Sequence, residues 1–147
     1  MPGRCVPEIS FYVLPTESSQ ERYLLACKLI EKANRNGFLT YVLTDSTEQS
    51  QLIEDLLWTF RAGSFIPHQI DKGELPEIEN VVLIGSDPPP EKGFKTLINL
   101  STRIPHGFTK AERILELIDD GEEAKALGRD RYRHYQQAGM EISIHKM

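Results

Sequence analysis

The chain has 147 residues, with 22 acidic and 17 basic side chains and a formal net charge of −5. This length most simply forms one domain with its own core, and 39% hydrophobic and 27% charged residues are ordinary for a globular protein. The acidic balance excludes a surface that binds nucleic acid throughout, because such binding depends on cations that neutralise phosphates. No signal-peptide pattern or apolar run of bilayer length is present, so we expect a cytoplasmic protein without a membrane partner.

The first half of the chain alternates short apolar runs with helical patterns. Residues 1–8 read as a flexible lead, and we expect a single α/β domain over residues 9–147. The predicted elements are a strand over 9–14, a helix from Ser18 or Ser19 to Asn36, a strand over 38–44 and a helix that Asp45 or Ser46 caps. Ser18 followed by Glu21 has the spacing of a capping box.

The second half continues the alternation after an irregular segment. Residues 64–68 are apolar but contain Pro67, which predicts a loop or edge strand instead of a central one. The further predicted elements are strands over 81–84 and 96–100, a short helix that starts within 113–118, a helix over 122–137 and a closing strand over 142–144. Apolar strands that alternate with helices predict a Rossmann-like α/β fold, with a mostly parallel sheet and helices on both faces.

A phosphate-binding glycine loop is missing from this pattern. Nucleotide-binding proteins of this architecture carry one after the first strand, whereas residues 14–20 read LPTESSQ. The four histidines do not have the spacing of metal ligands, so we expect neither a metal site nor a cofactor. A single sequence leaves open an active site assembled from distant residues. A small α/β nucleotide-binding protein or enzyme is therefore the alternative function.

A cationic face is the most informative feature of the C-terminal region. On a helix over 122–137, one narrow stripe contains Lys125, Arg129, Tyr132, Arg133 and Gln136. Such a stripe on an acidic chain suits a small anionic partner. Two other interpretations stay open: the cations pair with acids of their own helix, or they bind single-stranded DNA directly with weak, salt-dependent affinity.

Three motifs, in this order along the chain, carry a resemblance to a known family. They are FYVL at 11–14, LW at 57–58 with SFIPH at 64–68, and RDRYRHY at 129–135 with Ala-Gly at 138–139. Together they resemble the chi subunit family of bacterial DNA polymerase III holoenzyme. Two departures from the family pattern are a shorter loop over 85–95 and the lack of an aromatic residue among 145–147.

The resemblance implies an α/β adaptor of the clamp-loader complex that is not an enzyme and has no cofactor. One implied surface binds the psi subunit through Trp58, Phe65, Ile66, Pro67 and His68. The other binds the acidic C-terminal tail of single-stranded-DNA-binding protein through Ile118, Lys125, Arg129, Tyr132 and Arg133. Nucleic acid is then contacted only indirectly, and the psi-binding surface could also engage a helicase.

Elementary chemistry agrees with the implied tail site. The planar fork of an arginine can bind a carboxylate through two parallel hydrogen bonds, and Lys125 offers a more mobile charge. Tyr132 and Ile118 would form an apolar pocket for the terminal phenylalanine of the tail. Trp58 fits a core residue as well as a contact residue, whereas Phe65 in its proline-containing loop favours a contact.

Overall fold

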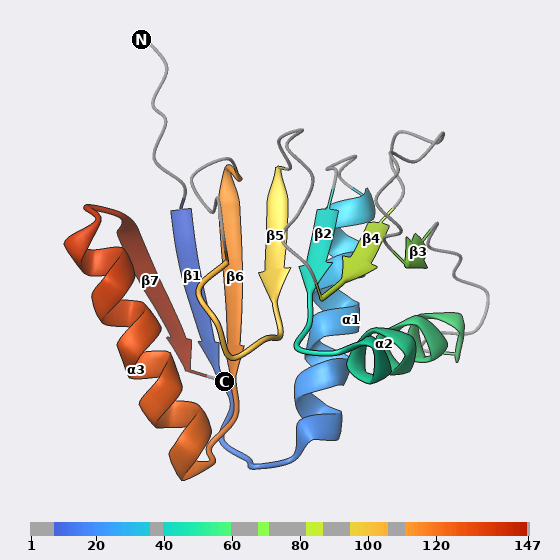
Figure 1. Cartoon of the computed structure of the whole chain (residues 1–147), viewed down its shortest axis with the longest axis horizontal. Helices are drawn as coiled ribbons and strands as arrows, with labels where there is room; N and C mark the ends of the chain where they lie inside the picture. Colours follow the sequence, from blue (N-terminus) through green and yellow to red (C-terminus); the bar gives the residue numbers. More distant parts are fainter. Residues whose placement is uncertain are drawn as a thin grey trace, which may run out of the picture.

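The computed structural model describes residues 8–35, 40–59, 68–70, 82–86, 95–105 and 111–146, without the side chains of residues 19 and 68–70. The described residues form one seven-stranded sheet in the order β3-β4-β2-β5-β6-β1-β7, in which every neighbouring pair is parallel (Figure 1). The strands are β1 Glu8–Val13, β2 Thr40–Leu43, β3 His68–Ile70, β4 Val82–Gly85, β5 Thr96–Asn99, β6 Arg113–Ile118 and β7 Glu141–Lys146. The helices are α1 Ser19–Arg35, α2 Thr47–Thr59 and α3 Glu122–Gln137. The predicted α/β class with a parallel sheet is confirmed.

The starts of α1 and α2 follow from side-chain caps. The Ser18 hydroxyl accepts a hydrogen bond from the backbone N–H of Glu21 at 3.2 Å, and the Ser46 hydroxyl accepts one from the N–H of Gln49 at 3.1 Å. Each cap satisfies a backbone donor that has no partner inside its helix. Ser46 is therefore the cap of α2, while the backbone N–H of the neighbouring Asp45 donates a hydrogen bond to Oε1 of Gln49 at 2.7 Å.

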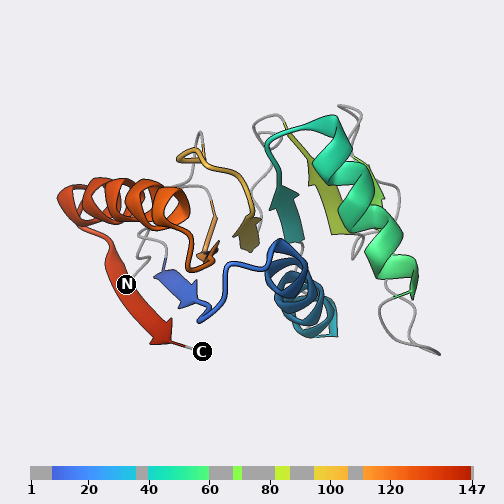
Figure 2. The ribbon, with the colours of Figure 1, turned by 90° about the horizontal axis from the view of Figure 1, so that it is seen from below.

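The order of the strands decides which face each helix covers. The β1-to-β2 and β2-to-β3 connections cross the sheet in one direction, and the β6-to-β7 connection crosses it in the other. Right-handed crossovers then place α1 and α2 on one face and α3 on the opposite face. Figure 2 shows α1 and α3 on opposite sides of the strands. No helix among the described residues is long and apolar enough to cross a membrane.

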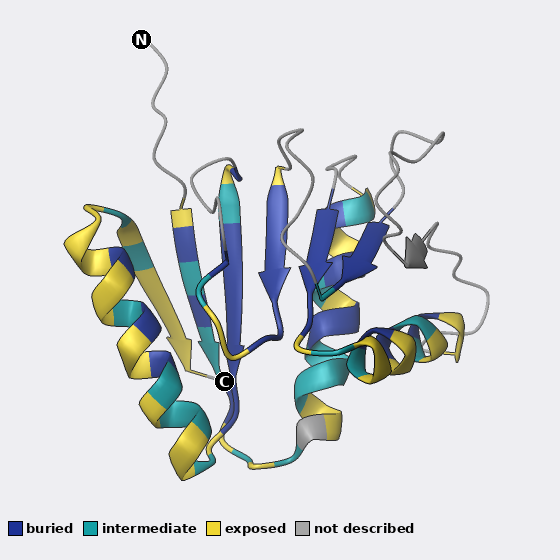
Figure 3. Ribbon diagram, viewed as in Figure 1, coloured by how far each residue is buried: buried dark blue, intermediate teal, exposed yellow. Residues whose placement is uncertain are grey.

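Two hydrophobic clusters, one on each face, form the core. The cluster under α1 and α2 contains Ala26, Cys27, Ile30, Val42, Ile53, Leu57, Val82, Ile84, Ile98, Leu100, Leu115 and Leu117. The cluster on the α3 face contains Ile9, Phe11, Tyr41, Leu43, Leu83, Leu97, Ala111, Ile114, Ile118 and Tyr135. The central strands are buried on both faces, whereas β7 at the margin is largely exposed (Figure 3). This burial explains why the strands read as continuous apolar runs.

The predicted short helix starting within residues 113–118 is wrong. These residues form β6, which pairs with β5 and β1 and is buried along most of its length. Its apolar residues Ile114, Leu115, Leu117 and Ile118 fit helical spacing as well as a strand buried on both faces. Periodicity cannot separate the two in so short a run. The two neighbouring strands decide the outcome.

A buried ion pair fixes α3 to the sheet. Glu116 of β6 is fully buried, and its carboxylate accepts hydrogen bonds from Arg131 Nε at 3.0 Å and from Tyr135 Oη at 2.6 Å. Asn99 of β5 donates a third bond to Glu116 at 2.9 Å, and Arg131 also donates to the Thr102 carbonyl at 3.3 Å. Burial raises the pKa of Glu116, while the Arg131 charge and the three donated bonds oppose that rise. The same burial and the nearby carboxylate raise the pKa of Tyr135.

We predict that Arg131→Met lowers the free energy of unfolding by about 3–5 kcal/mol at pH 7, because the Glu116 carboxylate loses its buried partner. In this variant, the pKa of Glu116 in the folded state lies further above the unfolded value of about 4.3. The loss should therefore be small near pH 4.3 and grow as the pH rises toward the folded-state pKa. Urea unfolding at pH 5 and pH 7 measures this difference.

Arg133→Met is the matched control, since Arg133 lies on the same helix and its side chain is 65% exposed. We expect a change within about 0.5 kcal/mol for this control. The double variant Arg131→Met with Glu116→Leu should recover most of the stability, because it removes both buried charges. Equal losses for the Arg131 and Arg133 variants would contradict the role of the buried pair.

Candidate functional site

A groove of about 320 Å³ lies between α3 and the β6-β1-β7 margin of the sheet. It is lined by Phe11, Val13, Ile118, Lys125, Gly128, Arg129, Tyr132 and Ile144. Most of this lining is apolar, and the two cations come from the first turns of α3. The groove therefore combines an apolar floor with positive charge, an arrangement that suits a ligand with one apolar group and one anionic group.

The register of three parallel strands builds the floor of the groove. Phe11 on β1 lies beside Ile144 on β7, and Val13 on β1 lies beside Ile118 on β6. Side chains of residues in register on neighbouring strands point to the same face of the sheet. Ile144 remains 52% exposed, because β7 is the last strand among the described residues and α3 leaves its outer part open. The floor is thus apolar and accessible.

A glycine brings α3 close to this floor. A Cβ atom at Gly128 would overlap with Cδ1 of Ile118, so a larger residue would force the helix or the isoleucine to move. Tyr132, one turn further along, stands against Phe11 with a distance of 5.7 Å between the ring centroids. The close approach at Gly128 holds both Lys125 and Arg129 over the apolar floor.

The cations of α3 differ in their partners. Lys125 Nζ lies 3.2 Å from a carboxylate oxygen of Asp120, and Arg133 pairs with Asp130 at 3.3 Å. Arg129 is exposed and makes no ion pair or hydrogen bond with any residue that the structure describes. The interpretation that the cations only neutralise acids of their own region therefore fits Lys125 and Arg133, but not Arg129.

Four of the five residues expected for the tail site meet in one place. They are Ile118, Lys125, Arg129 and Tyr132. Arg133 does not line the groove and is paired with Asp130 on the outer surface of the helix. The sequence interpretation missed four further lining residues, Phe11, Val13, Gly128 and Ile144. The alternation of apolar residues along the first and last strands could have indicated the three that lie on β1 and β7.

The residues expected to bind psi are only partly described. Trp58 lies on α2 and is 61% exposed, so a core position is excluded for it. Phe65, Ile66 and Pro67 lie outside the described residues. His68 begins β3, the edge strand beside β4, and α2 contacts that strand. For His68 alone, this agrees with the expected loop or edge position of residues 64–68.

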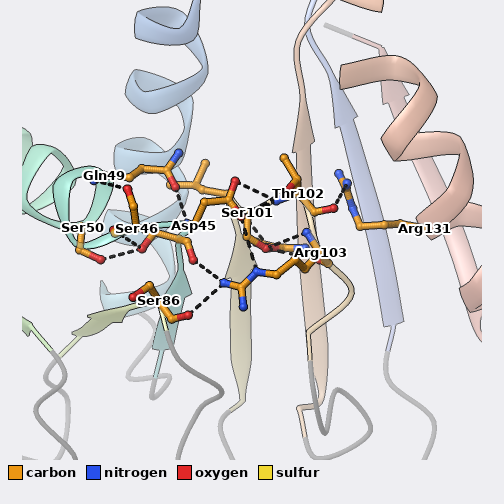
Figure 4. A network of polar contacts seen from close by, with 12 residues as sticks. Asp45, Ser46, Gln49, Ser50, Ser86, Ser101, Thr102, Arg103 and Arg131 are labelled. Carbon is orange, nitrogen blue, oxygen red and sulfur yellow. Dashed lines mark hydrogen bonds and ion pairs between the residues drawn. The ribbon is translucent and has the colours of Figure 1, made fainter. Parts of the chain in front are cut away.

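The carboxyl ends of the central strands contain a second polar cluster (Figure 4). The guanidinium of Arg103 donates to the carbonyl oxygens of Thr44 at 2.7 Å and Ser86 at 2.9 Å, and it lies 3.5 Å from the Asp45 carboxylate. Asp45 also accepts a hydrogen bond from the backbone N–H of Thr102 at 3.0 Å. Ligands of open α/β sheets usually bind at this end. Here the loops after β2, β4 and β5 are tied together by the chain's own side chains.

Comparisons with known proteins agree on one family. A family model described as DNA polymerase III chi subunit, HolC, matches residues 6–143. DNA polymerase III subunit chi of Pseudomonas aeruginosa is 30% identical over 139 residues, which cover 95% of this chain and 96% of that protein. DNA polymerase III subunit chi of Escherichia coli is 25% identical over 142 residues, which cover 91% of this chain and 94% of that protein.

A solved structure extends the comparison to the fold. The crystal structure of T4 UvsW matches with a TM-score of 0.69 and 12% identity over 95% of this chain, which spans only 41% of the UvsW chain. This likeness concerns the fold alone.

The parallel sheet with helices on both faces defines an α/β protein of Rossmann-like architecture. Within that class, the chain belongs to the DNA polymerase III chi subunit family. Membership of this family supports an accessory role in DNA replication as part of the polymerase complex.

Proposed function

We propose that this chain is a non-catalytic adaptor of the clamp-loader complex with two protein-binding surfaces. The α3 groove binds the acidic C-terminal tail of single-stranded-DNA-binding protein, and the surface around Trp58 binds the psi subunit. The observation that carries the proposal is Arg129, an exposed cation without a described partner that lines an apolar groove on an acidic chain.

The chemistry of the groove supports capture of a chain end. Arg129 can bind the terminal carboxylate through two parallel hydrogen bonds. The volume of about 320 Å³ under it is within the usual range for a small ligand site, and Phe11 and Tyr132 provide aromatic surface for a terminal phenylalanine. Lys125 stands one turn away for an acidic side chain of the same peptide.

The nucleotide-binding alternative has less support. The loops at the carboxyl ends of β2, β4 and β5 are linked through Arg103, whose guanidinium already bonds two backbone carbonyls. A phosphate group bound there would have to compete with the Asp45 carboxylate for the same cation. A nucleotide that binds must raise the melting temperature, so thermal unfolding in the presence of nucleotides tests this alternative.

We predict that Arg129→Ala weakens binding of the terminal peptide about ten- to hundred-fold, because a charge-assisted hydrogen bond contributes about 1.5–3 kcal/mol. Isothermal titration calorimetry with the acidic tail peptide measures the dissociation constant. The matched control is Arg35→Ala on α1, another exposed arginine, which pairs with Glu31 and should leave binding unchanged. Arg133→Ala should cause a smaller loss than Arg129→Ala. An unchanged dissociation constant for the Arg129 variant would refute the proposed site.

We also predict that Asp120→Asn strengthens peptide binding about two- to five-fold, because it removes the carboxylate that competes for Lys125. The gain should disappear in the double variant with Lys125→Gln, because Asp120 and the peptide then no longer compete for the Lys125 charge. It should also shrink at high salt, because both side chains are partly exposed. The same calorimetric titration measures all three effects, and weaker binding by the Asp120 variant would contradict this account.

The proposed psi surface rests on an exposed aromatic side chain. An exposed tryptophan on a helix beside an edge strand is the kind of residue that dominates the free energy of protein–protein binding. It lies on the helix that covers the opposite sheet face from α3. The two partners can therefore bind at the same time.

We predict that Trp58→Ala abolishes co-purification with psi and leaves the affinity for the tail peptide within about two-fold. Loss of a buried aromatic contact at an interface costs about 2 kcal/mol or more. Arg129→Ala should show the reverse pattern, with psi retained and the peptide lost. If either variant lost both partners while keeping its unfolding midpoint, the separation of the two surfaces would be wrong.

A further inference from the structure

The last described residue is a further cation, Lys146, which does not itself line the α3 groove but lies two residues beyond Ile144, which does. Lys146 of β7 is in register with Val13 of β1, which lines the groove. Along β7, Ile142 packs against the core on the α3 face and Ile144 lines the groove. Since side chains alternate along a strand, Lys146 points to the same face as these two isoleucines.

The positions along the groove follow from the direction of α3. Figure 1 shows α3 running opposite to the strands, so that its first turn lies at the same end of the sheet as the end of β7. Lys125 in the second turn is therefore on the Lys146 side of the groove, and Arg129 is one turn further from it. Four helical residues correspond to a rise of about 6 Å, or roughly two residues of an extended peptide.

This end of the sheet carries charges of both signs, because Glu122 and Glu123 lie in the first turn of α3 and Asp120 lies beside Lys125. Lys146 is exposed and forms no ion pair with the residues that the structure describes, whereas Lys125 is shared with Asp120. The neighbouring His145 points to the other face, where its ring stacks on Tyr12 at 4.8 Å between centroids. Glu141 lies at the opposite end of β7. Lys146 is thus a cation of β7 on the groove face of the sheet, beside Val13.

We propose that Lys146 binds the acidic side chains that precede the terminal residue of the captured peptide. The inference rests on the proposed function of the groove and adds a direction to it. The peptide enters over Lys146 and Lys125 and ends at Arg129. The acids that Lys146 contacts then lie about two or more residues before the terminal carboxylate. Selectivity for acidic tails comes from Lys146 and Lys125, and recognition of a free chain end comes from Arg129.

The test compares two peptides with the same terminal residue in calorimetric titrations. One carries the acidic residues of the tail, and in the other these residues are replaced by their amides. Lys146→Gln should weaken binding of the acidic peptide about two- to five-fold, as for a partly exposed ion pair, and Lys146→Glu should weaken it about ten-fold. Neither variant should change binding of the amide peptide by more than about two-fold.

Lys32→Gln, an exposed lysine in the last turn of α1, is the matched control and should bind both peptides like the unchanged protein. Urea unfolding of each variant checks that its free energy of unfolding, and hence the fold that includes β7, is unchanged. The role of Lys146 would be overturned if the unchanged protein and Lys146→Gln bound the acidic peptide with equal affinity. It would also be overturned if Lys146→Gln lost the same affinity for both peptides. If the unchanged protein bound neither peptide, the proposed function itself would fail.

Discussion

The contact between Glu116 and Arg131 is the constraint on which the groove depends. It joins the central part of β6 to the middle of α3, with both side chains almost completely buried at 0% and 6% exposure. A buried charge pair resists movement of α3 along the sheet, because such a movement would leave each partner as a buried, unpaired ion. The helix is thereby held in one position along the sheet. The fixed position of Arg131 therefore also determines where residues within one turn of it, including Arg129 and Tyr132, lie over the groove.

The basic side chains of α3 have different partners and therefore different roles. The helix has four lysine and arginine residues, and three of them have a carboxylate partner at 3.0–3.3 Å. Arg131 holds the helix to the sheet, Lys125 is balanced by Asp120, and Arg133 is balanced by Asp130 on the outer side. Only Arg129 has no such partner among the described residues. Local pairing thus concentrates the free positive charge at one point above an apolar floor.

The fold could be predicted from sequence more completely than the site. Buried strands and capped helices depend on local composition, so the elements from Ser18 to Leu43 and from Glu122 to Gln137 were expected close to their observed bounds. The β6 segment was misassigned, because its spacing fits both element types and only its neighbours in space distinguish them. The cations on α3 followed from helical spacing. The groove floor depends on strand register across the chain, which a single sequence does not specify.

The net negative charge of the chain bears on which ligands would suit the groove in the proposed function. A long polyanion approaching α3 would meet Asp120, Asp130 and the other acids of a chain with a net charge of −5, and only a few cations would offset that repulsion. In the proposed function, a short peptide end would instead place one carboxylate near Arg129 and one apolar side chain within the groove. Its remaining backbone would stay in solvent, where salt screens the surrounding acids over about 10 Å. The same electrostatic balance that disfavours nucleic acid is therefore compatible with the proposed binding of a chain end, because the attractive contact is local whereas the repelling acids are spread over the surface.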